Sequence, residues 1–162
     1  YVDYLLAKKF PGVKFIGIDR EPITKALNEV EFKDCPNMDF VAADIWDYLP
    51  GGSFNNGVFL HARTMLLFNR PLVEDIYGLV AKCGFKYIVG FEQFGISRTT
   101  GQGYTFDEND KESAYFRDGM YTHNYPWLLK KAGYEIQRAE IIKTGHPFPD
   151  YRFLAFIAKL SQ

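Results

Sequence analysis

Residues 13–27 carry the feature that most constrains what this chain can fold into. The segment "VKFIGID" (13–19) is almost continuously apolar and ends in Asp19, and "EPITKALNEVEF" (21–32) follows with a helical pattern. A continuous apolar run is typical of a parallel strand that is covered on both faces. Pro22 falls in the first turn of the expected helix, where its missing N–H costs nothing. A strand that passes directly into a helix predicts a β–α unit.

The same alternation continues along the rest of the chain. Further strands are expected where apolar runs recur, and further helices where apolar residues recur at helical spacing. The expected strands are 38–44, 57–62 and 85–92, and the expected helices are 2–10, 69–84 and 122–133. The buried side of the helix at 69–84 is expected to consist of Leu72, Val73, Ile76, Leu79 and Val80.

The C-terminal region departs from this alternation. Segments 134–142 and 151–160 show the two-residue alternation of strands, and a short connection joins them. The whole pattern predicts one α/β domain over residues 1–162. We expect a doubly wound, mostly parallel sheet with helices on both faces and a C-terminal antiparallel strand hairpin.

A long polar stretch interrupts the pattern at residues 93–121. A loop of this length inside a compact domain is usually functional or mobile, so we expect a lid or a substrate loop. Its aromatic side chains would suit a cover over an organic substrate, and they would equally suit packing against a partner subunit. A homo-oligomer is therefore possible.

Composition excludes several classes of protein. The net charge is −1 and no run of Lys or Arg exceeds two residues, so no nucleic-acid partner is expected. No apolar stretch approaches the ~20 residues of a membrane span, so no membrane partner is expected. Cys35 and Cys83 form no CxxC pair, which argues against a disulfide framework or a zinc site. We expect a cytoplasmic protein without a bound metal.

A doubly wound sheet that ends in a strand hairpin resembles the class I S-adenosylmethionine-dependent methyltransferases. "FPGVKFIGIDREPITKALNE" looks like the second strand and following helix of that family, and "MDFVAADIWDYLP" is similar to its third strand. "NYPWLLKKAGYEI" looks like a late segment of many small-molecule methyltransferases. By element order the resemblance covers nearly the whole chain, and it implies S-adenosylmethionine as the cofactor.

The resemblance also implies which residues bind that cofactor. Asp19 stands where the family has the carboxylate that holds the ribose hydroxyls, and Asp44 and Ile45 stand where adenine is read. Arg20 beside Asp19, and Leu60 in the fourth strand, are assigned to the cofactor as well. From the residues alone, Asp19 could instead cap the helix near Pro22, and Asp44 could cap a turn.

Two departures from the family pattern matter. The first strand and its glycine-rich loop are not found in residues 1–162, so we expect an N-terminally truncated chain, or a copy that never had the loop. At the entry to the fourth strand, where many relatives carry Asp, this chain has Asn55 and Asn56. Any role that the acid plays elsewhere is therefore in doubt here.

Candidate acceptor-site residues lie near the carboxyl ends of later strands, where open α/β sheets bind ligands. His61 and His123 are the candidate general bases, because histidine titrates near neutral pH. Arg63 could anchor an anionic substrate, while Glu92 and Tyr125 could contact the acceptor. A plain structural role remains open for each of these side chains.

The functional hypothesis is methyl transfer from S-adenosylmethionine to a small-molecule acceptor, at oxygen because histidine and carboxylate bases are available. Two alternatives stay open. One is a non-catalytic, methyltransferase-like binding module, which a true absence of the glycine loop would favour. The other is a NAD-dependent oxidoreductase, although Tyr125 and Lys130 are five residues apart, the wrong spacing for the Tyr-x-x-x-Lys pair of that class.

Overall fold

The computed structural model describes residues 2–94, 113–117, 119–143 and 152–161. The chain divides into two compact units, residues 1–52 and residues 53–162. Of the loop predicted at 93–121, residues 95–112 and 118 lie outside the described residues. The prediction of a single domain over 1–162 stays a prediction.

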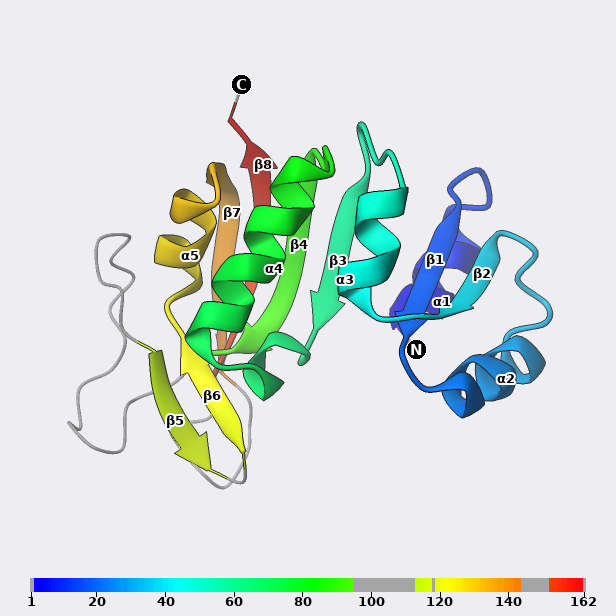
Figure 1. The fold of residues 1–162 in the computed structure, drawn as a ribbon, viewed down its shortest axis with the longest axis horizontal. Coiled ribbons are helices and arrows are strands. Elements are labelled where there is room, and N and C mark those ends of the chain that lie inside the picture. Colours follow the sequence, from blue (N-terminus) through cyan, green and yellow to red (C-terminus); the bar gives the residue numbers. More distant parts are fainter. Residues whose placement is uncertain (1, 95–112, 118, 144–151, 162) are drawn as a thin grey trace. The chain divides into compact units, whose positions relative to one another are not determined.

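The first unit is built around two parallel strands. In chain order it contains α1 (Val2–Lys9), β1 (Phe15–Asp19), α2 (Pro22–Glu31), β2 (Met38–Ala42), α3 (Ile45–Tyr48) and the 3-10 helix η1 (Leu49–Gly51) (Figure 1). The pairing of β1 with β2 runs in register from Phe15 opposite Met38 to Asp19 opposite Ala42. The predicted β–α unit at 13–32 is therefore present.

Helix α2 begins at Pro22 as predicted, but its apolar side is not covered. Ile23, Leu27 and Val30 recur at helical spacing and are 65%, 62% and 71% exposed. No residue of this helix is buried. The sequence pattern thus predicts the helix and its apolar side correctly, while the described residues supply no partner for that side.

The second unit contains a four-stranded sheet in the order β3-β4-β8-β7. Its elements are β3 (Val58–Ala62), η2 (Met65–Leu67), α4 (Arg70–Lys82), β4 (Tyr87–Gln93), β5 (Ser113–Arg117), β6 (Met120–His123), α5 (Tyr125–Lys131), β7 (Tyr134–Lys143) and β8 (Arg152–Leu160). Strands β3 and β4 are parallel, and β8 lies antiparallel between β4 and β7. The predicted C-terminal antiparallel pair is confirmed.

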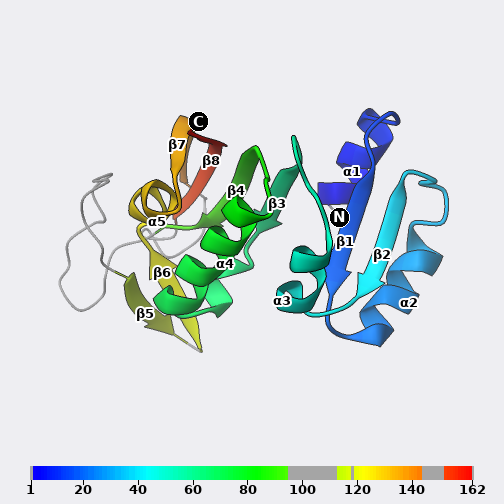
Figure 2. The same cartoon turned by 45° about the horizontal axis from the view of Figure 1, so that its top comes forward.

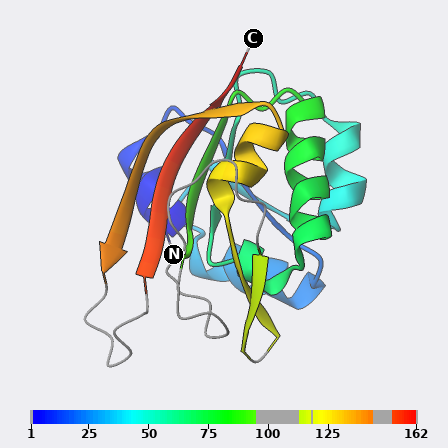
Figure 3. The same cartoon turned by 90° about the vertical axis from the view of Figure 1, so that its left-hand side faces the viewer.

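Helices α4 and α5 pack side by side against one face of this sheet (Figure 3). The fold is mixed α/β as expected, with parallel pairs followed by antiparallel strands. Strands β5 and β6 pair antiparallel and lie largely within the predicted loop segment, whose role as a lid or substrate loop stays a prediction. None of the described helices has the length and hydropathy that a membrane crossing would require.

The buried side of α4 differs from the predicted one at three residues, because Leu72 is exposed, Leu79 is only half-buried and Tyr77 is buried. Asn69 caps the helix by accepting a hydrogen bond from the Leu72 N–H at 3.2 Å. This start turns Leu72 toward solvent, where it is 38% exposed. Tyr77 is instead fully buried, together with the predicted Val73, Ile76 and Val80. Helical spacing from Val73 to Tyr77 brings the tyrosine onto the buried side.

Gly90 in β4 permits the closest packing in the sheet core. A Cβ at this position would lie 2.2 Å from the Phe156 ring of the neighbouring β8. Phe156 is 2% exposed and stacks on Tyr125, with ring centroids 5.6 Å apart. Because the ring is enclosed, it cannot move aside to admit a methyl group.

We therefore expect Gly90→Ala to lower the free energy of unfolding by roughly 1–3 kcal/mol, the usual cost of overpacking a core. Gly78→Ala is the matched control, since Gly78 lies inside α4 and its Cβ would meet no atom within 4 Å. The control should raise stability by about 0.5–1 kcal/mol through helix propensity. Denaturant unfolding of both variants measures the difference, and equal effects would contradict this description of the core.

Candidate active site

Two carboxylates of the first unit follow the carboxyl ends of its parallel strands. Strands β1 and β2 lie side by side in Figure 2. Asp19 is the last residue of β1 and pairs with Ala42, the last residue of β2. The Ala43 N–H donates to the Asp19 carbonyl oxygen at 3.0 Å, and Asp44 follows directly. The parallel register thus brings Asp19 and Asp44 to the same edge of the pair, as the sequence predicts.

Each of these carboxylates uses one oxygen to fix the backbone that follows it. Asp19 Oδ1 accepts the Glu21 N–H at 2.8 Å, and Asp44 Oδ1 accepts the Trp46 N–H at 3.0 Å. Within the described chain, no other side-chain hydrogen bond or ion pair reaches either carboxylate. Oδ1 of each side chain therefore holds the turn, and Oδ2 has no hydrogen-bond partner among the described residues.

The capping alternatives are settled differently for the two acids. Asp44 is the N-cap of α3, so the capping role predicted for it is real. The N-cap of α2 is Glu21, which makes no side-chain cap, whereas Asp19 closes a turn before the helix begins. Both local roles engage one carboxylate oxygen and leave ligand binding by the other oxygen possible.

The other predicted cofactor residues are placed as follows. Arg20 is exposed, and its Nε lies 3.5 Å from Glu21 Oε1. Ile45 is the first residue of α3 and is half-buried. Leu60 is a half-buried residue of β3 in the second unit.

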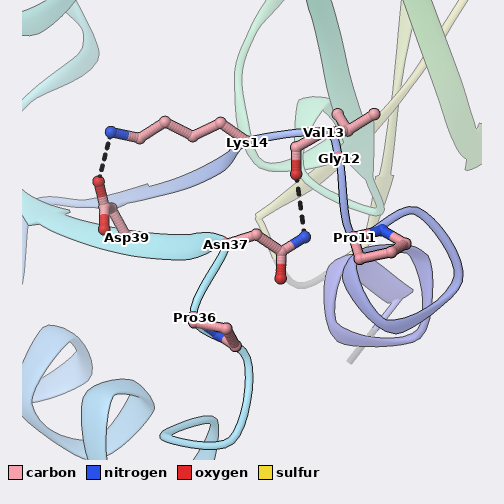
Figure 4. Close-up of a pocket in the computed structure, with 7 residues that line it drawn as sticks. All are labelled: Pro11, Gly12, Val13, Lys14, Pro36, Asn37 and Asp39. Carbon is pink, nitrogen blue, oxygen red and sulfur yellow. Dashed lines mark hydrogen bonds and ion pairs between the residues drawn. The ribbon is translucent and has the colours of Figure 1, made fainter.

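A shallow hollow lies at the opposite end of the same strand pair (Figure 4). The Lys14 ammonium pairs with Asp39 at 2.7 Å, and the Asn37 amide donates to the Val13 carbonyl at 2.9 Å. The Asn37 amide also lies within hydrogen-bond distance of the Ala7 and Phe10 carbonyls. These contacts tie α1 to the start of β2, so we read the hollow as structural.

The second unit contains a buried polar cluster centred on Glu92, at the carboxyl end of β4. Glu92 Oε1 accepts from His61 Nδ1 at 2.8 Å, from the Thr64 N–H at 2.9 Å and from the Met65 N–H at 3.1 Å. The Glu92 side chain is fully buried and that of His61 is 3% exposed. A buried carboxylate requires such donors, because leaving it unpaired would be costly.

Tyr77 completes the hydrogen bonding of His61. Its hydroxyl lies 3.0 Å from His61 Nε2. A carboxylate can only accept, so His61 Nδ1 carries the proton, and in the neutral ring Nε2 accepts from Tyr77. Burial raises the pKa of Tyr77 well above its usual value, and the Glu92 charge raises it further. Both ring nitrogens of His61 are therefore occupied inside the core.

His123 is the second predicted base, and it is also buried. Its Nε2 lies 3.0 Å from the Phe68 carbonyl oxygen and 3.3 Å from that of Met65, so this nitrogen donates. Burial lowers the pKa of His123, although the two carbonyls and the Glu92 charge partly oppose that effect. The neutral ring fastens β6 to the loop between β3 and α4.

Tyr125 is a further neighbour of Glu92. Among the described residues, Tyr125 OH and Glu92 Oε2 are the two buried side-chain atoms without a hydrogen-bond partner. Burial raises the pKa of Tyr125 well above its usual value, and the Glu92 charge adds to the shift. A donor and an acceptor left over at one place are complementary, so a small movement or one bridging water would satisfy both.

The structure thus brings four predicted residues together, but inside the core. His61, Glu92, His123 and Tyr125 are all buried, whereas Arg63 is exposed. The expectation that the two histidines face an acceptor does not fit these positions, because their described contacts are with core groups. Sequence reasoning missed Tyr77 and the amides of Thr64 and Met65. Helical spacing from Val73 could have indicated Tyr77, whereas nothing in the sequence indicates the amides.

No metal site is indicated. In the part of the chain that the structure describes, no three His, Cys, Asp or Glu side chains are grouped so that they could hold an ion. Cys35 and Cys83 are not joined to each other by a disulfide.

Comparison with solved structures identifies the fold. A SAM-dependent methyltransferase from Methanosarcina mazei superposes with a TM-score of 0.65 at 14% identity, covering 98% of this chain and 86% of that one. Magnesium protoporphyrin IX methyltransferase (ChlM) from Synechocystis PCC 6803, with bound SAH, gives a TM-score of 0.64 at 11% identity, covering 91% of this chain and 64% of that one. This is the class I methyltransferase fold.

Other comparisons limit what the methyltransferase fold implies. The cyclase SpnF gives a TM-score of 0.62 at 12% identity, covering 91% of this chain and 67% of that one. No protein-family model and no curated protein sequence matches the chain. The chain spans less than two thirds of ChlM. Because one fold hosts several activities, the activity of this chain has to be argued from its own residues.

The lowered pKa of His123 predicts how stability depends on pH. A histidine whose folded-state pKa lies below its unfolded value stabilises the fold fully above about pH 6.5, and this contribution is lost as the pH falls. We expect His123→Phe, which cannot titrate, to flatten the decline below pH 6.5. At pH 8 the variant should be about 1–3 kcal/mol less stable, because buried carbonyls lose their donor. Urea unfolding between pH 5 and 8 tests this, and an unchanged pH slope would contradict it.

Proposed function

We propose that the chain binds S-adenosylmethionine and transfers its methyl group to a small-molecule acceptor, at an oxygen atom. The observation that carries the proposal is the placement of Asp19 and Asp44 beyond the ends of two parallel strands, each with one oxygen unused. Open α/β sheets bind their ligands at this edge. The similarity of fold to methyltransferases supports the same reading.

The cofactor would be held by groups whose chemistry fits adenosine. Asp19 is exposed and can accept from the ribose hydroxyls with Oδ2, while Oδ1 keeps its bond to the Glu21 N–H. Asp44 can accept from the adenine amino group, and the Ile45 N–H can donate to a ring nitrogen. Arg20 is the further contact in this proposal, whereas the assignment of Leu60, which belongs to the second unit, stays a prediction.

The bound cofactor would supply an electrophilic methyl group on a sulfonium. Transfer is an in-line displacement, so the protein contributes mainly alignment, which is worth up to ~7–11 kcal/mol when the geometry is ideal. Proton removal is the smaller part of the task. The proposal therefore does not require the exposed general base that the sequence suggests.

The residues proposed for the acceptor keep different roles. A base function of His61 or His123 stays a prediction, and their hydrogen bonds support a positioning function instead. Glu92 and Tyr125 are buried and would act through the loop that they support. Arg63 is the exposed candidate for direct contact.

A non-catalytic binding module is the second candidate. The burial of both predicted bases favours it, since their described hydrogen bonds all lie within the core. Cofactor binding is common to both candidates. Transfer of a radiolabelled methyl group from S-adenosylmethionine to small-molecule extracts separates them, because the binding module would give no labelled product.

Calorimetric titration of the full-length protein with SAH, and separately with NAD, tests the cofactor. We expect SAH to bind and NAD not to bind. Asp19→Asn keeps the acceptor for Glu21 but removes the charge, and it should weaken SAH binding by about tenfold or more. Asp39→Asn is the matched control at the opposite end of the same strands, and its affinity should be unchanged. Binding of NAD alone, or equal affinity in both variants, would refute the assignment.

A further inference from the structure

The backbone of Arg63 adopts an unusual conformation. Its φ is +55°, in the left-handed region that residues with a Cβ seldom adopt. Asn56 is the other described non-glycine residue with positive φ, and asparagine tolerates this region in turns. An arginine has no such preference, so the conformation of Arg63 has to be imposed by its surroundings. Such residues occur preferentially at functional sites.

Hydrogen bonds on both sides of Arg63 impose that conformation. The Arg63 N–H donates to the Phe91 carbonyl at 2.9 Å, which continues the pairing of β3 with β4 by one residue. The next two amides, of Thr64 and Met65, both donate to Glu92 Oε1. Phe91 and Glu92 are consecutive in β4, so one strand end fixes the whole turn.

Glu92 is itself held in place. His61 donates to the same carboxylate oxygen, and Tyr77 in turn bonds His61. His123 binds the carbonyls of Met65 and Phe68, so the loop is held at its carbonyls as well as at its amides. The hydrogen bonds of the buried cluster therefore hold the turn after β3 in place, and Arg63 is an exposed residue of this turn.

The side chain of Arg63 is exposed and lies against aromatic rings. Its Cζ is 6.0 Å from the centroid of the Phe153 ring, at a distance that allows cation–π attraction. Phe153 stacks on Phe91, with centroids 4.7 Å apart and an interplanar angle of 8°. This support limits the freedom of the guanidinium while leaving it accessible to solvent.

Arg63 also differs from other described arginines in its charge partners. Arg20, Arg70 and Arg138 each lie within 4 Å of a glutamate carboxylate, that of Glu21, Glu74 and Glu140 respectively. Among the residues with described side chains, no carboxylate pairs with Arg63. An exposed guanidinium without a carboxylate partner is suited to bind an anion from solution.

We propose that Arg63 binds an anionic group, a carboxylate or a phosphate, of a ligand from solution, and that Glu92 is the positioning residue that aims it. This inference concerns the second unit alone and does not rest on the proposed function.

NMR titration of the unaltered, 15N-labelled protein tests the proposal without any variant. Acetate, inorganic phosphate and neutral acetamide are added at low ionic strength while the arginine Nε–Hε signals are followed. We expect the Arg63 signal to shift saturably with acetate or phosphate, with an affinity roughly threefold or more above that of Arg138, and not with acetamide. The anion that binds more tightly identifies the group. A response no larger than that of Arg138 overturns the proposal.

The same samples with added SAH separate this inference from the proposed function. An anion response without SAH binding supports the Arg63 site and counts against the methyltransferase proposal. SAH binding without an anion response overturns the Arg63 site and leaves the cofactor proposal standing. In Arg63→Gln the anion-dependent shifts of the backbone amides of residues 63 and 64 should disappear, while Arg138→Gln is the control that should leave the response of the Arg63 signal unchanged.

Glu92→Gln tests the positioning role. Amide hydrogen exchange should accelerate by about tenfold or more at Thr64 and Met65, and the anion affinity of Arg63 should fall. In the same variant, the amides of Ile88 and Val89 within β4 should still exchange more slowly than those of the loop. Tyr125→Phe is the matched control, because it changes a neighbour of the Glu92 carboxylate that makes no hydrogen bond to the Thr64 or Met65 amide. It should leave hydrogen exchange at Thr64 and Met65 unchanged. A uniform acceleration at all four amides would indicate a general loss of stability and would overturn the positioning role.

Discussion

Parallel pairing is the constraint on which the candidate sites depend. When two neighbouring strands run in the same direction in register, the residues that follow them emerge at one edge. In the first unit this places Asp19 and Asp44 beyond β1 and β2. In the second unit it places Arg63 and Glu92 at the ends of β3 and β4. Antiparallel pairing would send one member of each pair to the opposite edge, and the chemistry of each site would be dispersed.

The two edges use their acids in opposite ways. Asp19 and Asp44 lie near the surface, and one carboxylate oxygen of each accepts a hydrogen bond from a local turn, so a polar ligand can still reach the other oxygen. Glu92 is fully buried and collects three donors on one oxygen. The first arrangement is suited to binding from solution. The second is suited to shaping backbone, and it explains how a turn with an arginine in the left-handed region can persist.

The sequence predicted the β–α unit, the strand hairpin and the acids after β1 and β2, because apolar runs and chain order determine these features. It could not predict that His61 and His123 are buried. A histidine near the end of a strand can face either the core or the solvent, and only the packing decides between the two. Tyr77 was missed although its helical spacing from Val73 places it on the buried side of α4. The exposed side of α2 shows the same limit, since its apolar pattern says nothing about a partner.

The account rests on an adenosine held at the carboxyl edge of β1 and β2. A crystal structure of the full-length protein with SAH tests this most directly. The account predicts both ribose hydroxyls within hydrogen-bond distance of the Asp19 carboxylate, and the adenine beside Asp44 and the Ile45 amide. Density for SAH elsewhere, with Asp19 and Asp44 still facing solvent, would contradict it.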